Sequence, residues 1–473
     1  MKGENMNLRS VLLLGLGTGV CCAVQAQDSD ITIPHRAGLP VGDSIAAAAP
    51  GAVQVIYSNL AGHPTAEVPG LPGVGFQPGG GNAHFDRVYG SPNGSWALTA
   101  FADLPWTEDE VLLVNGELVV REGTAATWTS GELVGPLDTK VGVNDAGDFV
   151  FSTVTNGPAA SNAYVVTGGS DGTLGVVAQA GSPAPAMPGV TWGPFLESPT
   201  IATDGTVALV AGGLGGVPAN ENKVVVQGAT VLAQIGVTIP GGQIGNEPWQ
   251  NFDFLDLWTT PDGEHYLVQG DLDGSIDTDD VVVVDGNVVV QEGVVLPGSG
   301  FSNPVNNNGI VGVHMTPGGR YFVRGNNVAG IDWVYSDGQL VARLGWPITP
   351  LASENWSDRD YADCFFLHVG NSKGDYVIGG VTNGDSRTNG VLVLNGERVL
   401  AREGDPVDLD GNGVFDDDLY LDTFGNDDGY LSDSGLFYFV ATLRNGAGAS
   451  AGQAFLSIQL ADDVIFSDGF ESP

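Results

Sequence analysis

The sequence repeats itself, and this repeat restricts the possible folds more than any other feature of the chain. The clearest copy is VLVLNGERVLAREG (391–404), in which two apolar runs flank a glycine turn and a glycine closes the unit. The pattern recurs as VLLVNGELVVREG (111–123), KVVVQGATVLAQIG (223–236), DVVVVDGNVVVQEG (280–293) and DWVYSDGQLVARLG (332–345), with a looser copy at YVVTGGSDGTLGVVAQAG (164–181). Self-similarity at a period of this length is typical of repeat architectures.

A second pattern precedes each copy: a tight turn followed by an apolar run. It occurs seven times, with turn glycines at Gly94, Gly147, Gly205, Gly263, Gly319, Gly374 and Gly435. Asn-Gly and Asp-Gly between apolar runs are strong hairpin signals, because both turn residues need positive φ. No window shows a helical period of apolar residues. A four-stranded meander repeated seven times predicts an all-β, seven-bladed β-propeller.

Ring closure is also predicted by the ends of the repeat region. The seventh unit has apolar strands at 419–423, 436–443 and 453–460 but no fourth strand, whereas an unassigned strand, AVQVIYS (52–58), precedes the first unit. We expect the N-terminal strand to complete the last blade. A right-handed β-solenoid is the alternative, although it does not require its ends to pair. The predicted organisation is a signal peptide (1–26), a linker (27–50), the propeller (51–460) and a tail (461–473).

The first residues predict export. Lys2 and Arg9 precede an apolar run from Val11 to Val20, and Val24-Gln25-Ala26 forms a small-residue cleavage signal. The run is too short to cross a bilayer, so we expect a signal peptide cut after Ala26 and a secreted, periplasmic or cell-surface protein without a membrane span. Cys364 is then the only cysteine left, which excludes an internal disulfide.

The charge balance excludes one class of partner. The chain has 56 acidic and 16 basic residues, a formal net charge of −40. This charge repels phosphate backbones and anionic lipid, so we expect no nucleic-acid binding, and it attracts divalent cations. Charged residues make up only 15% of the chain, which is typical of a folded protein rather than a disordered acidic one. We expect a monomer.

The repeat unit, v-v-v-x-G-x-v-l-a-r-x-G-d, resembles that of a group of uncharacterised secreted bacterial proteins built from tandem units of this kind. The resemblance covers roughly residues 50–460 and implies a propeller-like architecture but no activity. The C-terminal VIFSDGFESP (464–473) is similar to a short terminal tag on exported proteins of some Gram-negative bacteria.

An acidic stretch between the sixth and seventh units has the spacing of a calcium loop. In DPVDLDGNGVFDDDLYLD, ligand positions 1, 3, 5, 7 and 9 are taken by Asp408, Asp410, Asn412, the Val414 carbonyl and Asp416. Ca²⁺ needs six to eight oxygens, which alternate acidic residues on a curled loop supply. Position 12 is Leu419, so Asp417 or Asp418 must replace the usual glutamate. The alternative is a solvated acidic connection between blades.

Two further acidic stretches are less specific. GDLDGSIDTDD (270–280) lies between the second and third strands of the fourth blade, and turn formation alone could explain its composition. As candidate calcium ligands it offers Asp271, Asp273, Ser275, Asp277 and Asp279. GNDDGYLSD (425–433) is interpreted as a turn.

Tryptophans mark the connections between blades. Five of the nine lie there: Trp128, Trp192, Trp249, Trp346 and Trp356. Equivalent connections share one face of a propeller, so these rings could form a sugar-stacking surface. The alternative is that they are packing anchors between blades.

Polar residues on the predicted first strands point to the central channel. Asp256, His314 and His368 are the candidate catalytic residues, and Asp86, Arg87, Asp253 and Asp422 fall on equivalent strands. Histidine with paired carboxylates supports lyase or hydrolase chemistry, whereas polar channel linings also occur in propellers without activity.

The sequence therefore favours an exported, calcium-stabilised propeller that acts as a binding or surface-interaction module for a carbohydrate or protein ligand. A polysaccharide lyase or hydrolase and a structural envelope protein are the alternatives.

Overall fold

The computed structural model describes residues 53–79, 84–137, 140–169, 172–253, 255–359 and 363–460. The predicted signal peptide, linker and tail lie outside the described residues. Within the described part of the chain, no helix is both long and apolar enough to cross a membrane. Two short 3₁₀ turns are present, η2 (Pro64–Ala66) and η3 (Ala219–Glu221).

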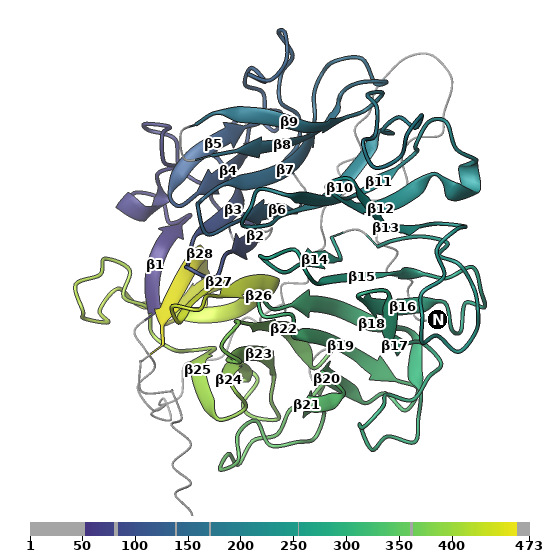
Figure 1. The fold of residues 1–473 in the computed structure, drawn as a ribbon. Helices are drawn as coiled ribbons and strands as arrows, with labels where there is room; N and C mark the ends of the chain where they lie inside the picture. Colours follow the sequence, from purple (N-terminus) through teal and green to yellow (C-terminus); the bar gives the residue numbers. More distant parts are fainter. Residues whose placement is uncertain are drawn as a thin grey trace, which may run out of the picture.

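Seven four-stranded antiparallel sheets form the predicted β-propeller (Figure 1). Blade 1 consists of β2 (Phe85–Gly90), β3 (Trp96–Phe101), β4 (Glu110–Val114) and β5 (Glu117–Arg121). Blade 2 consists of β6 (Val141–Val143), β7 (Phe149–Val154), β8 (Ala163–Gly168) and β9 (Leu174–Gln179). Blade 3 consists of β10 (Phe195–Ile201), β11 (Val207–Gly212), β12 (Lys223–Gln227) and β13 (Thr230–Gln234).

The remaining blades follow the same order. Blade 4 consists of β14 (Leu257–Thr259), β15 (Tyr266–Asp271), β16 (Asp280–Val284) and β17 (Asn287–Gln291). Blade 5 consists of β18 (Val305–Met315), β19 (Tyr321–Asn327), β20 (Asp332–Ser336) and β21 (Gln339–Arg343). Blade 6 consists of β22 (Phe365–Gly370), β23 (Tyr376–Val381), β24 (Gly390–Leu394) and β25 (Arg398–Arg402). Blade 7 contains β26 (Leu419–Leu431), β27 (Leu436–Asn445) and β28 (Ser450–Gln459).

The two ends of the repeat region close the ring. β1 (Val53–Ser58) is the fourth strand of blade 7 and pairs antiparallel with β28, from Val53 opposite Ile458 to Ser58 opposite Ala454. Figure 1 shows the purple β1 beside the yellow β28. This pairing confirms the predicted closure and excludes the solenoid alternative.

The hairpin between the third and fourth strands follows from its turn residues. Asn115, Asp285, Asp337 and Asn395 all have φ between 46° and 53°, and the glycine that follows each also has positive φ. Two successive positive φ values define the type I′ turn, whose twist matches that of the strands it joins. The Asn-Gly and Asp-Gly pairs in the repeat therefore form the turns predicted from them.

The hydrophobic core lies between neighbouring blades. One buried cluster joins Leu267 and Val282 of blade 4 to Val313, Val323 and Trp333 of blade 5. The third strands are apolar at consecutive positions, because both of their faces pack against an adjacent blade.

The turns between first and second strands meet on one face of the ring, here called the turn face. Hydrogen bonds join adjacent turns: Asp433 N–H donates to Pro92 O (2.8 Å), and Asn93 N–H donates to Asp145 Oδ1 (3.0 Å). The connections between blades, and those between second and third strands, lie on the opposite face, the loop face. The first strands run between these faces and surround the channel.

Candidate functional site

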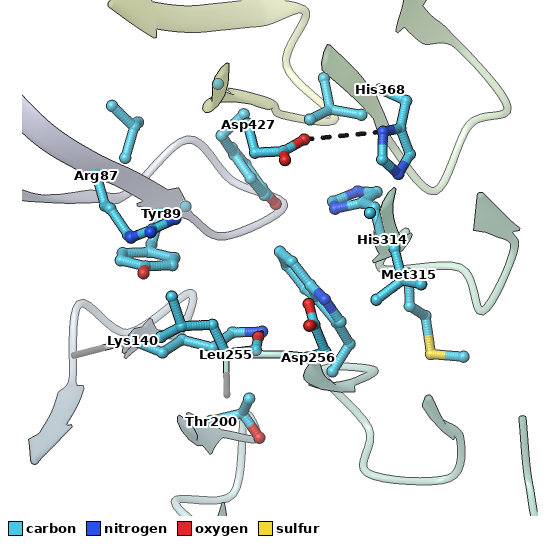
Figure 2. A pocket seen from close by; sticks show the side chains of 18 of the residues that line it. Arg87, Tyr89, Lys140, Thr200, Leu255, Asp256, His314, Met315, His368 and Asp427 are labelled. Carbon is cyan, nitrogen blue, oxygen red and sulfur yellow. Dashed lines mark hydrogen bonds and ion pairs between the residues drawn. The ribbon is translucent and has the colours of Figure 1, made fainter. Parts of the chain in front are cut away.

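The first strands of the seven blades enclose a central cavity of about 390 Å³ (Figure 2). This volume falls within the range of sites that bind small molecules. Asp256, His314 and His368, which the sequence singled out, all line it, as does Arg87. The cavity reaches the turn face, since Pro92, Pro261 and Pro317 of the turns also border it.

Two histidines and a tryptophan form one wall of the cavity. The ring of His314 on β18 meets the edge of Trp258 on β14, with centroids 4.6 Å apart, and lies 6.5 Å from the ring of His368 on β22. Gly370 N–H donates to His314 Nε2 (3.4 Å). Burial lowers the pKa of His314 to about 3, and it also lowers the pKa of His368 well below the ordinary value. Both imidazoles are therefore neutral at pH 7.

Lys140 and Asp256 form a second group. Lys140 precedes β6, is buried, and donates through Nζ to Leu257 O (2.5 Å) and Leu255 O (3.2 Å). Its ammonium lies 3.3 Å from the ring centroid of Trp258. Burial lowers the pKa of Lys140 and raises that of Asp256 to about 7, while each group opposes the shift of the other through its charge. Asp256 is therefore a carboxyl group that titrates near neutrality.

Arg324 and Asp427 form a third group. Arg324 on β19 donates through Nη2 to Asp427 Oδ2 (2.6 Å) and to Asn426 Oδ1 (3.1 Å), both on β26. Asp427 Oδ1 lies 3.8 Å from His368 Nδ1. Burial raises the pKa of Asp427, and the guanidinium of Arg324 opposes this shift. A single carboxylate thus connects blade 7 to blades 5 and 6 across the cavity.

Left-handed backbone occurs at several residues outside the repeat hairpins, and two of these, Leu255 and Asp427, line the cavity. Ser198 on β10, Leu255 just before β14, Asn308 on β18 and Asp427 on β26 all have φ between 50° and 71°. None belongs to a repeat hairpin, and a bulky residue such as Leu255 seldom adopts this conformation. Leu255 N–H donates to Ser198 Oγ (2.8 Å), which supports both positions. Strained backbone of this kind is concentrated at functional sites in many proteins.

Sequence reasoning missed several members of the cavity. Lys140, Trp258, Arg324 and Asp427 were not among the predicted site residues. Lys140 directly precedes the first strand of blade 2, and Trp258 lies on the first strand of blade 4. A search for polar or aromatic residues on first strands, which found His314, could therefore have found them. Asp427 belongs to the stretch interpreted as a turn, whereas the structure shows it within β26. Arg324 lies on a second strand and carries no comparable signal.

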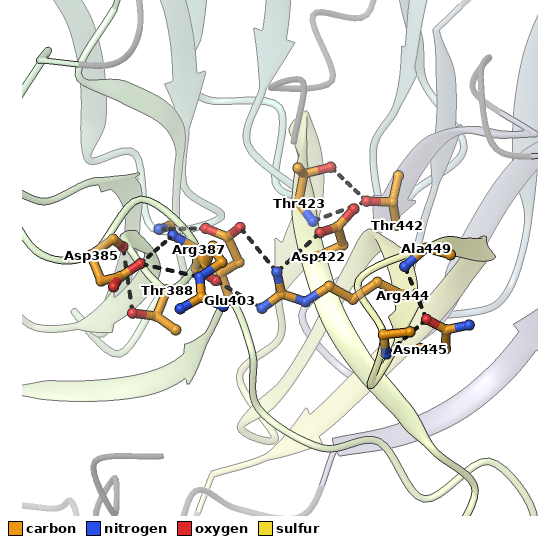
Figure 3. Close-up of polar contacts among 12 residues, drawn as sticks. Asp385, Arg387, Thr388, Glu403, Asp422, Thr423, Thr442, Arg444, Asn445 and Ala449 are labelled. Atoms are coloured by element: carbon orange, nitrogen blue, oxygen red, sulfur yellow. Dashed lines mark hydrogen bonds and ion pairs between the residues drawn. The ribbon is translucent and has the colours of Figure 1, made fainter. Parts of the chain in front are cut away.

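Asp422 has a different environment from the other predicted channel residues (Figure 3). The guanidinium of Arg444 lies between two carboxylates, with Nη1 3.6 Å from Asp422 Oδ1 and 4.0 Å from Glu403 Oε1. Arg444 Nη2 also donates to Arg387 O (2.8 Å). This buried network connects blades 6 and 7, so it stabilises the contact between them.

The acidic loop between blades 6 and 7 brings three carboxylates together. Oxygens of Asp408, Asp410 and Asp417 all lie within 4.8 Å of one another. Asp408 Oδ2 accepts from Gly413 N–H (2.7 Å), which curls the loop. Of the two residues considered for position 12, Asp417 belongs to this group, whereas Asp418 Oδ1 accepts from Gly446 N–H (3.0 Å) in the turn between β27 and β28.

Asn412 lies beside this group, since its N–H donates to Asp410 Oδ1 (3.1 Å) and its Nδ2 donates to Asp410 Oδ2 (2.9 Å). Its Oδ1 accepts from Val414 N–H (2.7 Å), and Asp416 lies outside the cluster of three carboxylates. Among the described residues, Asp271, Asp273 and Asp277 do not form a cluster with ligand oxygens within 4.8 Å of one another. Ser275 O instead accepts from Thr278 N–H (2.8 Å), which is a turn contact.

The five predicted ligand-binding tryptophans differ in exposure. Trp192, Trp249 and Trp356 are at most 4% exposed, and their burial supports the packing alternative. Trp128 is half-buried and packs against Phe151, with ring centroids 5.8 Å apart. Only Trp346 among the five is substantially exposed, at 40%.

Comparisons with known proteins show what the chain is similar to and assign it no activity. Residues 106–243 match a family of unknown function, DUF7453. No curated protein matches the chain. The crystal structure of polysaccharide lyase Uly1 is similar over 83% of this chain and 94% of its own, with 11% identity and a TM-score of 0.37. The WD40 β-propeller domain of Doa1 is similar over 87% and 98%, with 11% identity and a TM-score of 0.29. Together with the seven blades, the family match agrees with tandem propeller repeats.

Proposed function

We propose that the protein is a carbohydrate-binding propeller and that the central cavity is its binding site. The observation that carries this proposal is the gathering of charged and aromatic side chains around one small volume. Three of the chain's 16 basic residues, Arg87, Lys140 and Arg324, line the cavity beside Asp256 and Asp427. Donors, acceptors and ring faces in one cavity match the hydroxyl groups and apolar faces of a sugar.

The size of the cavity favours a saccharide over a folded protein partner. A volume of about 390 Å³ admits a sugar unit or a chain end, whereas a protein domain would have to bind outside it. Export, which the N-terminal segment predicts, would expose this site to extracellular or periplasmic saccharides.

A glycan array followed by calorimetry tests this proposal. We expect the protein to bind a defined class of glycan and R87Q to weaken that binding at least about tenfold. R398Q, which makes the same change on the outermost strand of blade 6, should bind as the wild type does. Absence of binding to any glycan, or equal binding by R87Q, would contradict the proposal.

Acid–base catalysis in the same cavity is a second candidate function. It is favoured by Asp256, whose pKa of about 7 suits a group that donates or accepts a proton near neutrality, close to the neutral His314. Lyase and hydrolase chemistry both need such a group. The test is cleavage of whichever polysaccharide binds: D256N and H314A should lower kcat while the polymer still binds. If no bound polymer is ever cleaved, this candidate fails.

We further propose that Asp408, Asp410 and Asp417 bind one Ca²⁺ ion that stabilises the ring. Three carboxylates within 4.8 Å of one another supply the hard oxygen ligands that calcium prefers. None of these three residues lines the cavity, so this ion would have a structural role.

A further inference from the structure

Arg324 is a buried cation with only part of its hydrogen-bonding capacity used. Its side chain is 3% exposed, and its Nη2 contacts Asp427 and Asn426, whereas Nε and Nη1 have no hydrogen-bond partner. Gly312 on β18 lies against the guanidinium, since a Cβ there would come within 3.0 Å of Arg324 Nε. A buried guanidinium with unpaired donors is costly unless another group completes its contacts.

His368 adds a second incomplete group beside it. The side chain is 1% exposed, and neither ring nitrogen has a partner with hydrogen-bond geometry. Burial keeps this imidazole neutral, so it can donate through one nitrogen and accept through the other. Arg324 and His368 therefore offer unpaired donors on the two sides of the Asp427 carboxylate.

Asp427 reaches these groups from an irregular segment of β26. The ladder between β26 and β27 passes from Phe424 opposite Ala441 to Gly429 opposite Phe439, so the intervening residues bulge out of the sheet. Asp427 has φ of 60° and its side chain is 37% exposed, unlike the arginine it contacts. The Asp427 carboxylate therefore belongs to a bulge without ladder pairing to β27, and a second carboxylate can reach the same site.

We propose that Arg324 and His368 form a subsite for a carboxylate of the ligand, and that Asp427 occupies this subsite in the free protein. The inference rests on the proposed function and specifies it: the ligand is an acidic saccharide that contains a uronic acid. A ligand carboxylate makes the same charge-assisted bond to Arg324 as Asp427 does, and its neighbouring hydroxyl groups can pair with His368. Two carboxylates repel each other at one guanidinium, so the ligand displaces Asp427 and the bulge moves away.

This arrangement predicts that Asp427 lowers the affinity for acidic sugars. When only a fraction of the molecules is in the binding-competent state, the observed Kd equals the Kd of that state divided by the fraction. Replacing Asp427 with asparagine keeps a residue that tolerates left-handed backbone and removes the competing charge. We expect D427N to bind D-glucuronate and D-galacturonate at least about tenfold more tightly than the wild type.

Calorimetry with matched sugars provides the main test. D-glucose and D-galactose differ from the two uronates only in a hydroxymethyl group at the position of the carboxylate, and D427N should not change their binding. R324Q should abolish the preference for uronates. D273N removes one charge from an exposed loop of blade 4 and serves as the control. Equal affinity of D427N and the wild type for uronates, or an equal gain for neutral sugars, would overturn the inference.

A second measurement separates the subsite from the carbohydrate proposal. Acetate should raise the melting temperature of D427N above its value in an equal concentration of chloride, and the D427N/R324Q double variant should lose this rise. If acetate acts in this way but no sugar binds, the subsite holds and the carbohydrate function fails. If neutral sugars bind the wild type but D427N gains nothing for uronates or acetate, the function holds and the subsite fails. D427G, which also permits positive φ, replaces D427N if the latter does not fold.

Discussion

Gln54 on the closing strand pairs with Asp408 of the acidic loop through an isolated parallel β-bridge. β1 completes blade 7, and the loop connects blades 6 and 7, so this contact joins the N-terminal segment to the start of the last blade. The proposed calcium site therefore lies directly beside the seam of the ring. An ion bound by Asp408 would hold the loop against β1 and favour the closed state.

Calcium should raise the melting temperature of the wild type. A ligand present at 100 times its Kd stabilises the folded state by about 2.7 kcal/mol, which corresponds to a rise of about 3–5 °C for a chain of this size. The D408A/D410A double variant should melt at the same temperature in calcium and in chelator, as followed by circular dichroism.

The second acidic loop supplies the matched control. D273A/D277A removes two carboxylates from the connection in blade 4, and we expect it to keep the full rise. A wild-type protein that melts identically in calcium and in chelator would rule out the site, and a loss of the rise in D273A/D277A would move it to blade 4.

Asn59 should be a key residue of the seam. Its Oδ1 accepts from Gln453 N–H (2.7 Å), and its Nδ2 donates to Gln77 O and Gly79 O (3.1 and 3.0 Å). N59A leaves a buried backbone N–H without an acceptor, which costs about 1–3 kcal/mol. Urea unfolding measures this loss, and N220A, at an exposed position, should have little effect. Equal stability of N59A and the wild type would show that the side-chain contacts of Asn59 contribute little to ring closure.

Stability also separates the two roles considered for the inter-blade tryptophans. Trp249 is 1% exposed and packs against Phe252, with ring centroids 5.1 Å apart. W249A should destabilise the fold by about 3–5 kcal/mol, whereas W346A should cost about 1 kcal/mol because that ring is partly in solvent. A stable W249A variant that loses glycan binding would instead support the stacking surface.

The fold could be predicted from the sequence because its determinants are local. The Asn115-Gly116 and Asn395-Gly396 pairs adopt the turn conformation that their composition favours, and the period of the glycines gives the number of blades. Ring closure could be predicted by counting strands, because the seventh unit has only three strands and one unassigned strand precedes the first unit.

The candidate site could be predicted only in part. His314 and His368 stand out as polar residues between apolar neighbours on their first strands. The pair of Arg324 and Asp427 joins residues 103 positions apart through a bulge, which no local pattern encodes. The choice between Asp417 and Asp418 depended on where β26 begins. Burial of Trp249 and Trp356 could not be read from their positions, because packing and binding tryptophans occupy the same connections.

Stability should decrease between pH 5 and pH 8, and Glu122 should contribute to this decrease. Burial, reinforced by the charge of Asp109, raises the pKa of Glu122 to about 7. The folded state therefore binds a proton more tightly than the unfolded state, so the stabilising contribution is present at low pH and is lost as pH rises through 7. E122Q carries no charge to bury and should be more stable than the wild type at pH 8 by about 2 kcal/mol.

Urea unfolding at the two pH values measures the effect of Glu122. The difference between E122Q and the wild type should shrink at pH 5, where Glu122 is protonated in the folded state. E117Q, at an exposed position on β5, should show no such dependence on pH. A difference between E122Q and the wild type that is the same at both pH values would contradict a titrating Glu122.

Ligand binding should weaken as pH rises through neutrality, because Asp256 gains its charge there. Burial raises the pKa of Asp256 to about 7, and the charges of Asp253 and Asp427 add to this rise. The positive charges of Lys140 and Arg87 oppose it. His314, with a pKa of about 3, stays neutral throughout this range. A uronate is fully ionised at these pH values, so the newly charged Asp256 carboxylate repels it, and the affinity should fall about tenfold between pH 6 and pH 9.

Calorimetric titrations across this pH range measure the effect. D256N should bind uronates with nearly constant affinity, while D273N should follow the wild type. An unchanged pH profile in D256N would assign the dependence to another group.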